Sequence, residues 1–324
     1  MFKYLAALTL GLALAQAPAL AADAPYPAKV VKVVVPYPPD GPTDSAARVV
    51  AKSLGEQLGQ PFIIENRGGA SGTIGTAVVA REPADGYSLV VVAAHHVTNA
   101  ATGMKLPYDP IKDFDPIGAI AYLPVLMAVN GNLVPAKDLK SLVEWIRAQK
   151  VPVQYACSGS GSLTQLWGEL WARRNNLQLQ NIPYKGSADA ARAVVAGEVP
   201  LLFDVGGTTT TMIASGRLRG IVTAGSQRAP GLPDVPTARE AGAPDVEAQS
   251  FLGLLAPAGL PVPVRDKLNA ALNKALQDPE VLKVLAAQGL SPAGGSAQGF
   301  GKMLADDLKR WSEVARAANI SYAN

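Results

Sequence analysis

Two loops of the chain combine glycines and hydroxyl side chains with a helical pattern that follows directly. The first loop spans residues 36–44 and reads Pro-Tyr-Pro-Pro-Asp-Gly-Pro-Thr-Asp. Its prolines stiffen the backbone, Gly41 lets the chain approach a ligand closely, and Thr43 offers a hydroxyl. The start of a helix also favours a negatively charged ligand. The loop therefore fits an anion site, although a rigid turn that only begins a helix would have the same composition.

The second loop spans residues 157–164 and reads Cys-Ser-Gly-Ser-Gly-Ser-Leu-Thr. Exposed backbone amides, several hydroxyls and a following helix make an anion cradle suited to a carboxylate or a phosphate. The alternative is a flexible Gly/Ser turn. No Gly-Lys-Ser/Thr follows, so the loop is not a nucleotide-binding P-loop. It is not the nucleophile elbow of a hydrolase either, because Ala156 stands where a glycine is needed before Ser158.

A third glycine-rich loop and two histidines offer weaker signals. The glycines of residues 66–75 lack the G-x-G-x-x-G spacing of a dinucleotide site, so they indicate close helix–sheet packing and a part in a cleft wall. His95 and His96 are expected at the end of a strand, where neighbouring side chains point to opposite faces. One of them, His95 in our assignment, would then face a ligand. No metal site and no cofactor are expected.

The elements that must position these loops alternate between strand-like and helix-like periodicity, which predicts an α/β fold with parallel sheets covered on both faces. The expected strands span residues 30–35, 62–64, 87–93, 153–156, 201–204 and 218–224. The expected helices span residues 44–58, 73–82, 138–149, 162–175, 187–196, 208–214, 264–277, 280–288 and 297–318.

Two apolar segments predict that the chain crosses twice between domains. One spans residues 117–129 and is split by Pro124, and the other spans residues 251–256. We therefore expect a discontinuous first domain and an inserted second domain that close over a ligand by a hinge motion. The first comprises residues 22–124 and 250–324, and the second comprises residues 125–249.

The amino-terminal residues 1–21 have the three parts of a secretory signal peptide: a positive start, an apolar run and small residues at the cleavage site. No lipoprotein cysteine follows, so we expect a mature protein that is free in the periplasm. The single cysteine, Cys157, allows no intrachain disulfide and is interpreted as a small buried residue. The net charge of +3 comes from interspersed charges, which argues against nucleic-acid binding.

Markers along almost the whole chain resemble the Bug-type receptors, the periplasmic solute-binding proteins of tripartite tricarboxylate transporters (TctC-like). They include Tyr-Pro-Pro-Asp-Gly-Pro-Thr-Asp at residues 37–44 and Ile-Pro-Tyr-Lys-Gly at residues 182–186. The others lie at residues 65–75, 85–87, 106–110, 158–162, 216–219, 232–237, 240–242 and 256–259.

This resemblance implies a type II periplasmic-binding-protein fold, in which two doubly wound domains enclose a ligand cleft. It also implies a carboxylate ligand held by the second domain, with ordered waters bridging to the first. Carried over by position, the ligand-binding residues are Tyr37, Gly41, Thr43, Asp44, Ser158, Gly161, Ser162, Tyr184, Lys185, Gly186 and Asp204. The sequence departs from the family at Asp40, where a glycine is usual, and at Gln165, where a histidine is common.

The function expected from these observations is a monomeric receptor. It would capture an aromatic acid, a dicarboxylate, a tricarboxylate or an acidic amino acid and deliver it to membrane transporter subunits. A sensor that signals to a two-component kinase would have the same fold. A periplasmic hydrolase using Cys157 or a serine with His95 or His96 is a third alternative, and it lacks a recognisable nucleophile–base motif.

Overall fold

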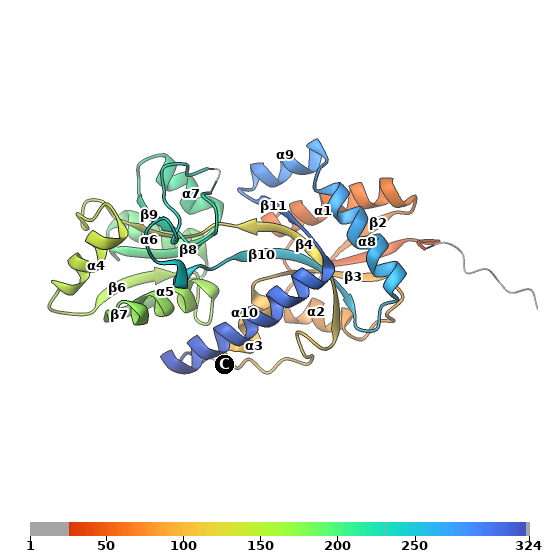
Figure 1. The fold of residues 1–324 in the computed structure, drawn as a ribbon, viewed down its shortest axis with the longest axis horizontal. Helices are drawn as coiled ribbons and strands as arrows, with labels where there is room; N and C mark the ends of the chain where they lie inside the picture. The colour runs from red at the N-terminus through yellow and green to blue at the C-terminus, as the bar shows by residue number, and fades with distance from the viewer. Residues whose placement is uncertain (1–25, 230, 322–324) are drawn as a thin grey trace, which may run out of the picture.

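The computed structural model describes residues 26–229 and 231–321, so the expected signal peptide at residues 1–21 lies outside the described residues. Figure 1 shows two lobes side by side along the long axis, each built around one β-sheet. Within the described ranges, no helix combines the length and the apolarity that a membrane crossing requires. The predicted α/β class, with two covered sheets, is confirmed, but the prediction of parallel sheets is wrong in part, because each sheet also contains antiparallel strands.

The sheet of the first lobe has six strands in the order β11-β4-β10-β3-β1-β2. Strands β1, β2 and β3 are parallel, whereas β10 runs antiparallel to both β3 and β4. The strands are β1 (Val31–Val35), β2 (Phe62–Asn66), β3 (Ser88–Ala93), β4 (Phe114–Leu123), β10 (Ser250–Pro257) and β11 (Ser291–Gly294).

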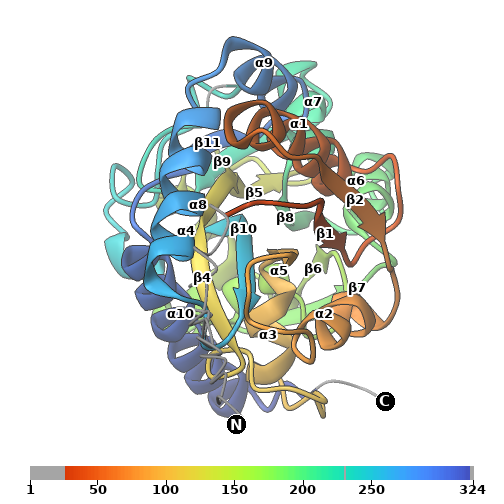
Figure 2. The ribbon, with the colours of Figure 1, turned by 90° about the vertical axis from the view of Figure 1, so that its right-hand side faces the viewer.

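Helices cover both faces of this sheet, as Figure 2 shows from one end of the molecule. Val31, Val33 and Val35 of β1 pack with α1, α8 and α9, while Val34 packs in the core beneath α2, α3 and α10. This alternation is what a strand buried on both faces requires. The helices are α1 (Pro42–Leu58), α2 (Thr73–Val79), α3 (His95–Ala101), α8 (Val262–Ala275), α9 (Pro279–Ala287) and α10 (Ala297–Ala318), with a 3₁₀ turn η1 (Ala70–Gly72).

The sheet of the second lobe has five strands in the order β7-β6-β8-β5-β9. Strands β6, β7 and β8 are parallel, and β5 is antiparallel to β8 and β9. The strands are β5 (Val125–Val129), β6 (Val153–Cys157), β7 (Leu179–Pro183), β8 (Leu201–Val205) and β9 (Arg219–Thr223). The helices are α4 (Leu139–Arg147), α5 (Leu163–Arg174), α6 (Ser187–Ala196) and α7 (Gly207–Ala214), with a 3₁₀ turn η2 (Pro244–Val246).

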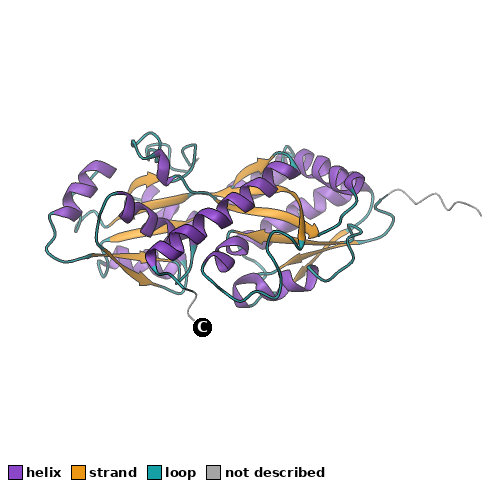
Figure 3. Ribbon diagram, turned by 60° about the horizontal axis from the view of Figure 1, so that its bottom comes forward, coloured by secondary structure: helices purple, strands orange, loops and turns teal. Residues whose placement is uncertain are grey.

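The chain passes between the sheets at the places where the apolar segments predicted crossings. Pro124 separates β4 in the first sheet from β5 in the second, and β10 re-enters the first sheet at Ser250. The long helix α10 starts in the first lobe and extends to the second, as Figure 3 shows, where its Ala317 carbonyl accepts a hydrogen bond from Arg173 of α5 at 2.6 Å. The division into domains 22–124 with 250–324 and 125–249 remains our proposal for the folding units.

Candidate functional site

The carboxyl ends of the parallel strands in both sheets lie next to the crossing strands. Ala93, the last residue of β3, pairs with Leu252 near the start of β10, and Val205, the last residue of β8, pairs with Val125 at the start of β5. The strand–helix loops of the two lobes therefore start at the junction between the lobes. Ligands of parallel α/β sheets bind at this edge.

Three helices that start at this junction begin at a glycine, with no side chain capping the first amides. These N-caps are Gly41 of α1, Gly186 of α6 and Gly206 of α7. By contrast, Ser162 caps α5, which starts at the same junction, and Asp138, Asp278 and Ser296 cap α4, α9 and α10. The uncapped helices leave backbone N–H groups without side-chain acceptors, and these groups carry the positive end of the helix dipole.

The side chain of Asp44 stabilises the first predicted loop through hydrogen bonds. Its carboxylate accepts hydrogen bonds from the Asp40 amide (3.1 Å), Arg48 Nε (2.8 Å) and Asn66 Nδ2 (2.8 Å). Burial opposes ionisation, but the hydrogen bonds from Arg48, Asn66 and Asp40 hold the pKa of Asp44 below its usual range. The helix begins at Pro42, two residues before the expected start, so Asp44 lies in the first turn. Its bonded carboxylate positions the loop.

The other predicted residues of this loop are more open to solvent. Gly41 and Thr43 are half-buried, and Asp40 is exposed with φ +64° in the left-handed region. Tyr37 packs against Gly72, where an added Cβ would lie 3.2 Å from the tyrosine hydroxyl. Burial raises the pKa of Tyr37, so the phenol is neutral and can donate a hydrogen bond.

The second predicted loop is closed by hydroxyl side chains. Ser162 Oγ donates to the Gly159 carbonyl at 2.6 Å, lies 2.9 Å from Thr164 Oγ1 and accepts from the Gln165 amide at 3.3 Å. Ser158 also bonds Thr164, through its amide (3.1 Å) and its hydroxyl (3.0 Å). Ser162 is therefore the N-cap of α5, and its hydroxyl also stabilises the conformation of the loop.

Gly161 lies where this loop meets the first lobe. An added Cβ at Gly161 would lie 3.2 Å from Oγ1 of Thr102, the residue that ends α3. Gly161 has φ +72°, which an L side chain rarely adopts. Its N–H donates to Oε1 of Gln165 at 2.7 Å. The sequence identified Gly161 and singled out Gln165, but gave no sign of this bond.

The remaining second-lobe residues lie at the ends of β7 and β8. The Tyr184 amide donates to the Cys157 carbonyl at 3.0 Å, which joins this segment to the Gly/Ser loop, and Lys185 is exposed. Asp204 is fully buried in β8, where Thr209 donates to Oδ2. Its Oδ1 has no hydrogen-bond partner among the described residues, and burial raises the pKa of this carboxyl.

The structure corrects the expectation for the histidines. His95 and His96 do not end a strand: β3 ends at Ala93, and both residues lie in the first turn of α3. His96 is buried, its Nε2 lies 2.7 Å from the Pro110 carbonyl, and its ring stacks on Tyr108. Burial lowers the pKa of His96 to about 4. His95 keeps an exposed side chain, although desolvation by the surrounding protein lowers the pKa of its imidazole.

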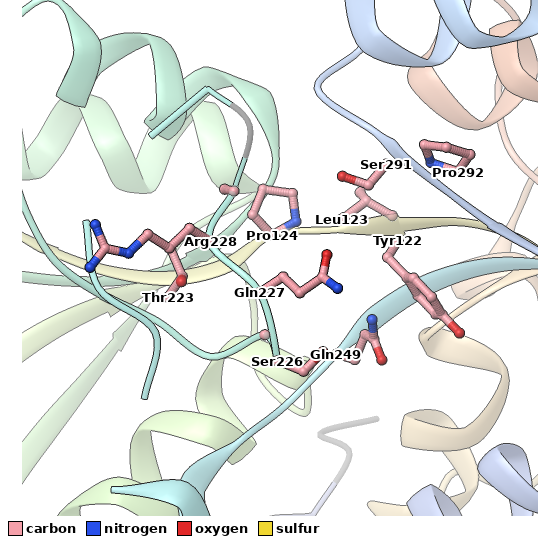
Figure 4. A pocket seen from close by; sticks show the side chains of 12 residues that line it. Tyr122, Leu123, Pro124, Thr223, Ser226, Gln227, Arg228, Gln249, Ser291 and Pro292 are labelled. Atoms are coloured by element: carbon pink, nitrogen blue, oxygen red, sulfur yellow. The ribbon is translucent and has the colours of Figure 1, made fainter. Parts of the chain in front are cut away.

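Two cavities open beside the crossing strands, and sequence reasoning missed both because they combine distant segments. A cavity of about 700 Å³ separates the start of α1 and the α9–β11 turn from α7; its lining includes Pro42, Thr208 and Leu290. A smaller cavity of about 280 Å³ lies around Tyr122, Pro124, Gln227 and Gln249 (Figure 4). The residues predicted to bind ligand do not line either cavity.

No group of three histidine, cysteine, aspartate or glutamate side chains in residues 26–229 and 231–321 is arranged to hold a metal ion. Cys157 is buried, and its Sγ lies 3.0 Å from Asn181 Oδ1. Burial raises the pKa of this thiol, so the thiolate that a nucleophile requires is disfavoured.

Comparison with known proteins points to one family. The TctC model, described as tripartite tricarboxylate transporter family receptor, matches residues 46–320. The chain is similar to protein BugT of Bordetella pertussis, with 34% identity over 295 residues that cover 90% of each chain.

Two solved structures add ligands to this comparison. A structure from R. palustris with adipate has a TM-score of 0.75 and 33% identity, and the match covers 91% of this chain and 99% of that one. MatC from Rhodopseudomonas palustris with bound malate has a TM-score of 0.71 and 33% identity, with 89% and 99% covered.

Proposed function

We propose that this chain, which belongs to the family of tripartite tricarboxylate transporter receptors, captures a small carboxylate in the periplasm and delivers it to the membrane subunits of such a transporter. The observation that carries the proposal is the set of helices at the junction of the lobes that start at uncapped glycines. These starts lie in both lobes, so a ligand between them would meet backbone amides from two sides. The adipate and malate complexes of related proteins support a carboxylate as the ligand.

The chemistry of capture is an exchange of water for backbone amides and hydroxyls. An ionised carboxylate has about four acceptor positions, and each charge-assisted hydrogen bond is roughly twice as strong as a neutral one. A helix N-terminus adds about 0.3–1 kcal/mol for a nearby negative charge. In the second lobe, we assign Ser158, Gly161, Ser162, Tyr184, Lys185, Gly186 and Asp204 to the ligand site. In the first lobe, we assign Tyr37, Gly41, Thr43, Asp44 and His95.

These assignments divide by role. The Gly186 amide can reach a ligand directly, because a glycine leaves its N–H uncovered by a side chain, whereas the Gly161 amide must first release Oε1 of Gln165. The side-chain oxygens of Asp44 and Ser162 already form hydrogen bonds within and beside their loops, so we assign these residues to positioning the loops. Burial raises the pKa of Asp204 and so favours its protonated form, and a protonated carboxyl can donate its hydrogen bond toward an anion.

Capture requires the lobes to close around the ligand. The hinge in this proposal consists of the two crossings, at Pro124 and at the start of β10. Closure would press Gly161 further against Thr102, which lies beside it in this structure. The closed form would then present a surface from both lobes to the membrane subunits, as the receptor role requires.

The proposal can be tested on freshly purified mature protein. Its bound small molecules are released by denaturation and identified by mass spectrometry, and the stripped protein is then titrated calorimetrically with adipate, malate, citrate, benzoate and aspartate. We expect a carboxylic acid in the released fraction and saturable binding of at least one acid. A released ligand without an acidic group, together with no heat from any acid, would refute carboxylate capture. Co-purification with a sensor kinase ectodomain instead of transporter subunits would refute the delivery step alone.

A further inference from the structure

One amide of the proposed carboxylate site is already occupied by a side chain of this chain. Gln165 lies in the first turn of α5, and its Oε1 accepts the Gly161 N–H at 2.7 Å. A carboxamide oxygen offers an N–H the same kind of acceptor that a carboxylate oxygen offers. A ligand carboxylate that binds the Gly161 amide must therefore first displace Gln165.

This bond differs from ordinary helix capping. In the usual capping box, the third helical residue returns a bond to the amide of the N-cap residue itself. Here the amide of the N-cap Ser162 bonds the Gly159 carbonyl at 3.3 Å, and Gln165 reaches one residue further, to the loop. Helix α4 of the same lobe has the usual form, because Ser141 Oγ accepts the amide of its N-cap Asp138 at 3.2 Å.

The position of Gln165 also allows it to move. Its side chain is half-exposed, so it can swing into solvent without opening the core. Gly161, in contrast, is buried and lies against Thr102 of the other lobe. The Gly161 amide is thus at the contact between the lobes, and the Gln165 side chain that bonds it can move away into solvent.

We infer that Gln165 is a displaceable internal acceptor that competes with the ligand carboxylate for the Gly161 amide and so sets the affinity of the receptor. This inference rests on the proposed function. A ligand gains at this amide only by the difference between its own hydrogen bond and that of Gln165. An ionised carboxylate gains, because its bond is charge-assisted, whereas a neutral carbonyl replaces one neutral acceptor with another.

The test uses three variants of the full mature chain. Gln165→Ala removes the competitor, and Gln165→Glu replaces it with a charged one that still suits the third position of a helix. Ser141→Ala is the control, because it removes a comparable capping bond from α4, at the outer end of the same lobe (Figure 1). The readouts are the ¹H–¹⁵N shift of the Gly161 amide and calorimetric titration with adipate, malate and citrate, with acetate followed at the same amide as a minimal carboxylate.

For Gln165→Ala, we expect an upfield proton shift of the ligand-free Gly161 amide and about three- to tenfold tighter binding of the acids, the range that follows when a competing hydrogen bond of ordinary net strength is removed. Gln165→Glu should bind acids more weakly than wild type at neutral pH, because a charged acceptor then competes for the same amide and repels the ligand carboxylate. Ser141→Ala should leave both readouts unchanged.

The outcomes separate this inference from the proposed function. An unchanged Gly161 shift in Gln165→Ala, or weaker acid binding by that variant, would overturn the inference, since Gln165 would then be absent from the amide or would itself hold the ligand. If neither the wild type nor any variant bound an acid, the proposed function would fail, together with the competition that depends on it. Acid binding unaffected by Gln165→Glu would overturn the inference and leave the proposed function intact.

Discussion

Ser162→Ala should weaken both the second-lobe loop and the ligand site that the loop forms. The hydroxyl donates to the Gly159 carbonyl at 2.6 Å and accepts the Gln165 amide at 3.3 Å, and Ser162 is 6% exposed. Loss of an N-cap costs about 0.5–2 kcal/mol, and an unpaired buried partner costs about 1–3 kcal/mol. Because the loop can relax, we expect a loss of about 1–2 kcal/mol in the free energy of unfolding and a similar loss in binding.

The assay is urea unfolding followed by circular dichroism, together with calorimetric titration of the acid that binds best. Ser296→Ala is the matched control: Ser296 caps α10 with one bond to the Gly299 amide at 3.0 Å, and it is exposed in the first lobe. It should cost about 0.5–1 kcal/mol of stability and leave binding unchanged. The reasoning is refuted if Ser162→Ala is no less stable than Ser296→Ala and binds the acid with wild-type affinity.

Three further changes test other parts of the structure. Asp44→Asn removes the charge that Arg48 and Asn66 stabilise, so it should lower the unfolding free energy by about 1–2 kcal/mol at pH 7. Because folding lowers the pKa of Asp44, this loss of stability should fade as the pH falls through the folded pKa. A loss that is the same at every pH would contradict the argument. Asp204→Asn should have the opposite pH dependence. Burial raises the folded pKa of Asp204, so the wild type loses stability as the pH rises through that value. The urea midpoint of the variant should therefore rise relative to that of the wild type between pH 4 and pH 7. An equal midpoint difference at the two pH values would refute the burial argument. Gly253→Ala places a Cβ 2.0 Å from the Phe300 ring and should cost about 1–3 kcal/mol, measured by thermal unfolding, and a wild-type midpoint would show that the ring moves freely.

The sequence predicted the elements best where periodicity was strong. The β-branched run at Val31–Val35 and the amphipathic α10 lie where we expected them. Strand β7 was missed because Leu179–Pro183 mixes exposed and half-buried side chains and lacks an apolar alternation. The helix at His95 was missed because it starts after Ala94, with no capping residue to mark it.

The candidate site could be predicted in composition but not in geometry. Glycines, hydroxyls and helix starts identified the loops at residues 36–44 and 157–164, and these two loops do lie at strand ends near the junction of the lobes. The sequence could not show that Asp44 turns its carboxylate to Arg48 and Asn66, or that Gln165 turns to Gly161. Those orientations depend on loop dihedral angles such as φ +72° at Gly161, which residue types alone do not determine.

The most direct test of the central claim compares an acid with its neutral amide. The stripped mature protein is titrated calorimetrically with the acid of the panel that binds best and with the corresponding amide, which has almost the same shape but no charge. Because the proposed site consists of uncapped helix N-termini and charge-assisted bonds, we expect the acid to bind at least about a hundredfold more tightly. Equal affinities for the acid and the amide would contradict the account, since the lobes would then recognise shape without charge.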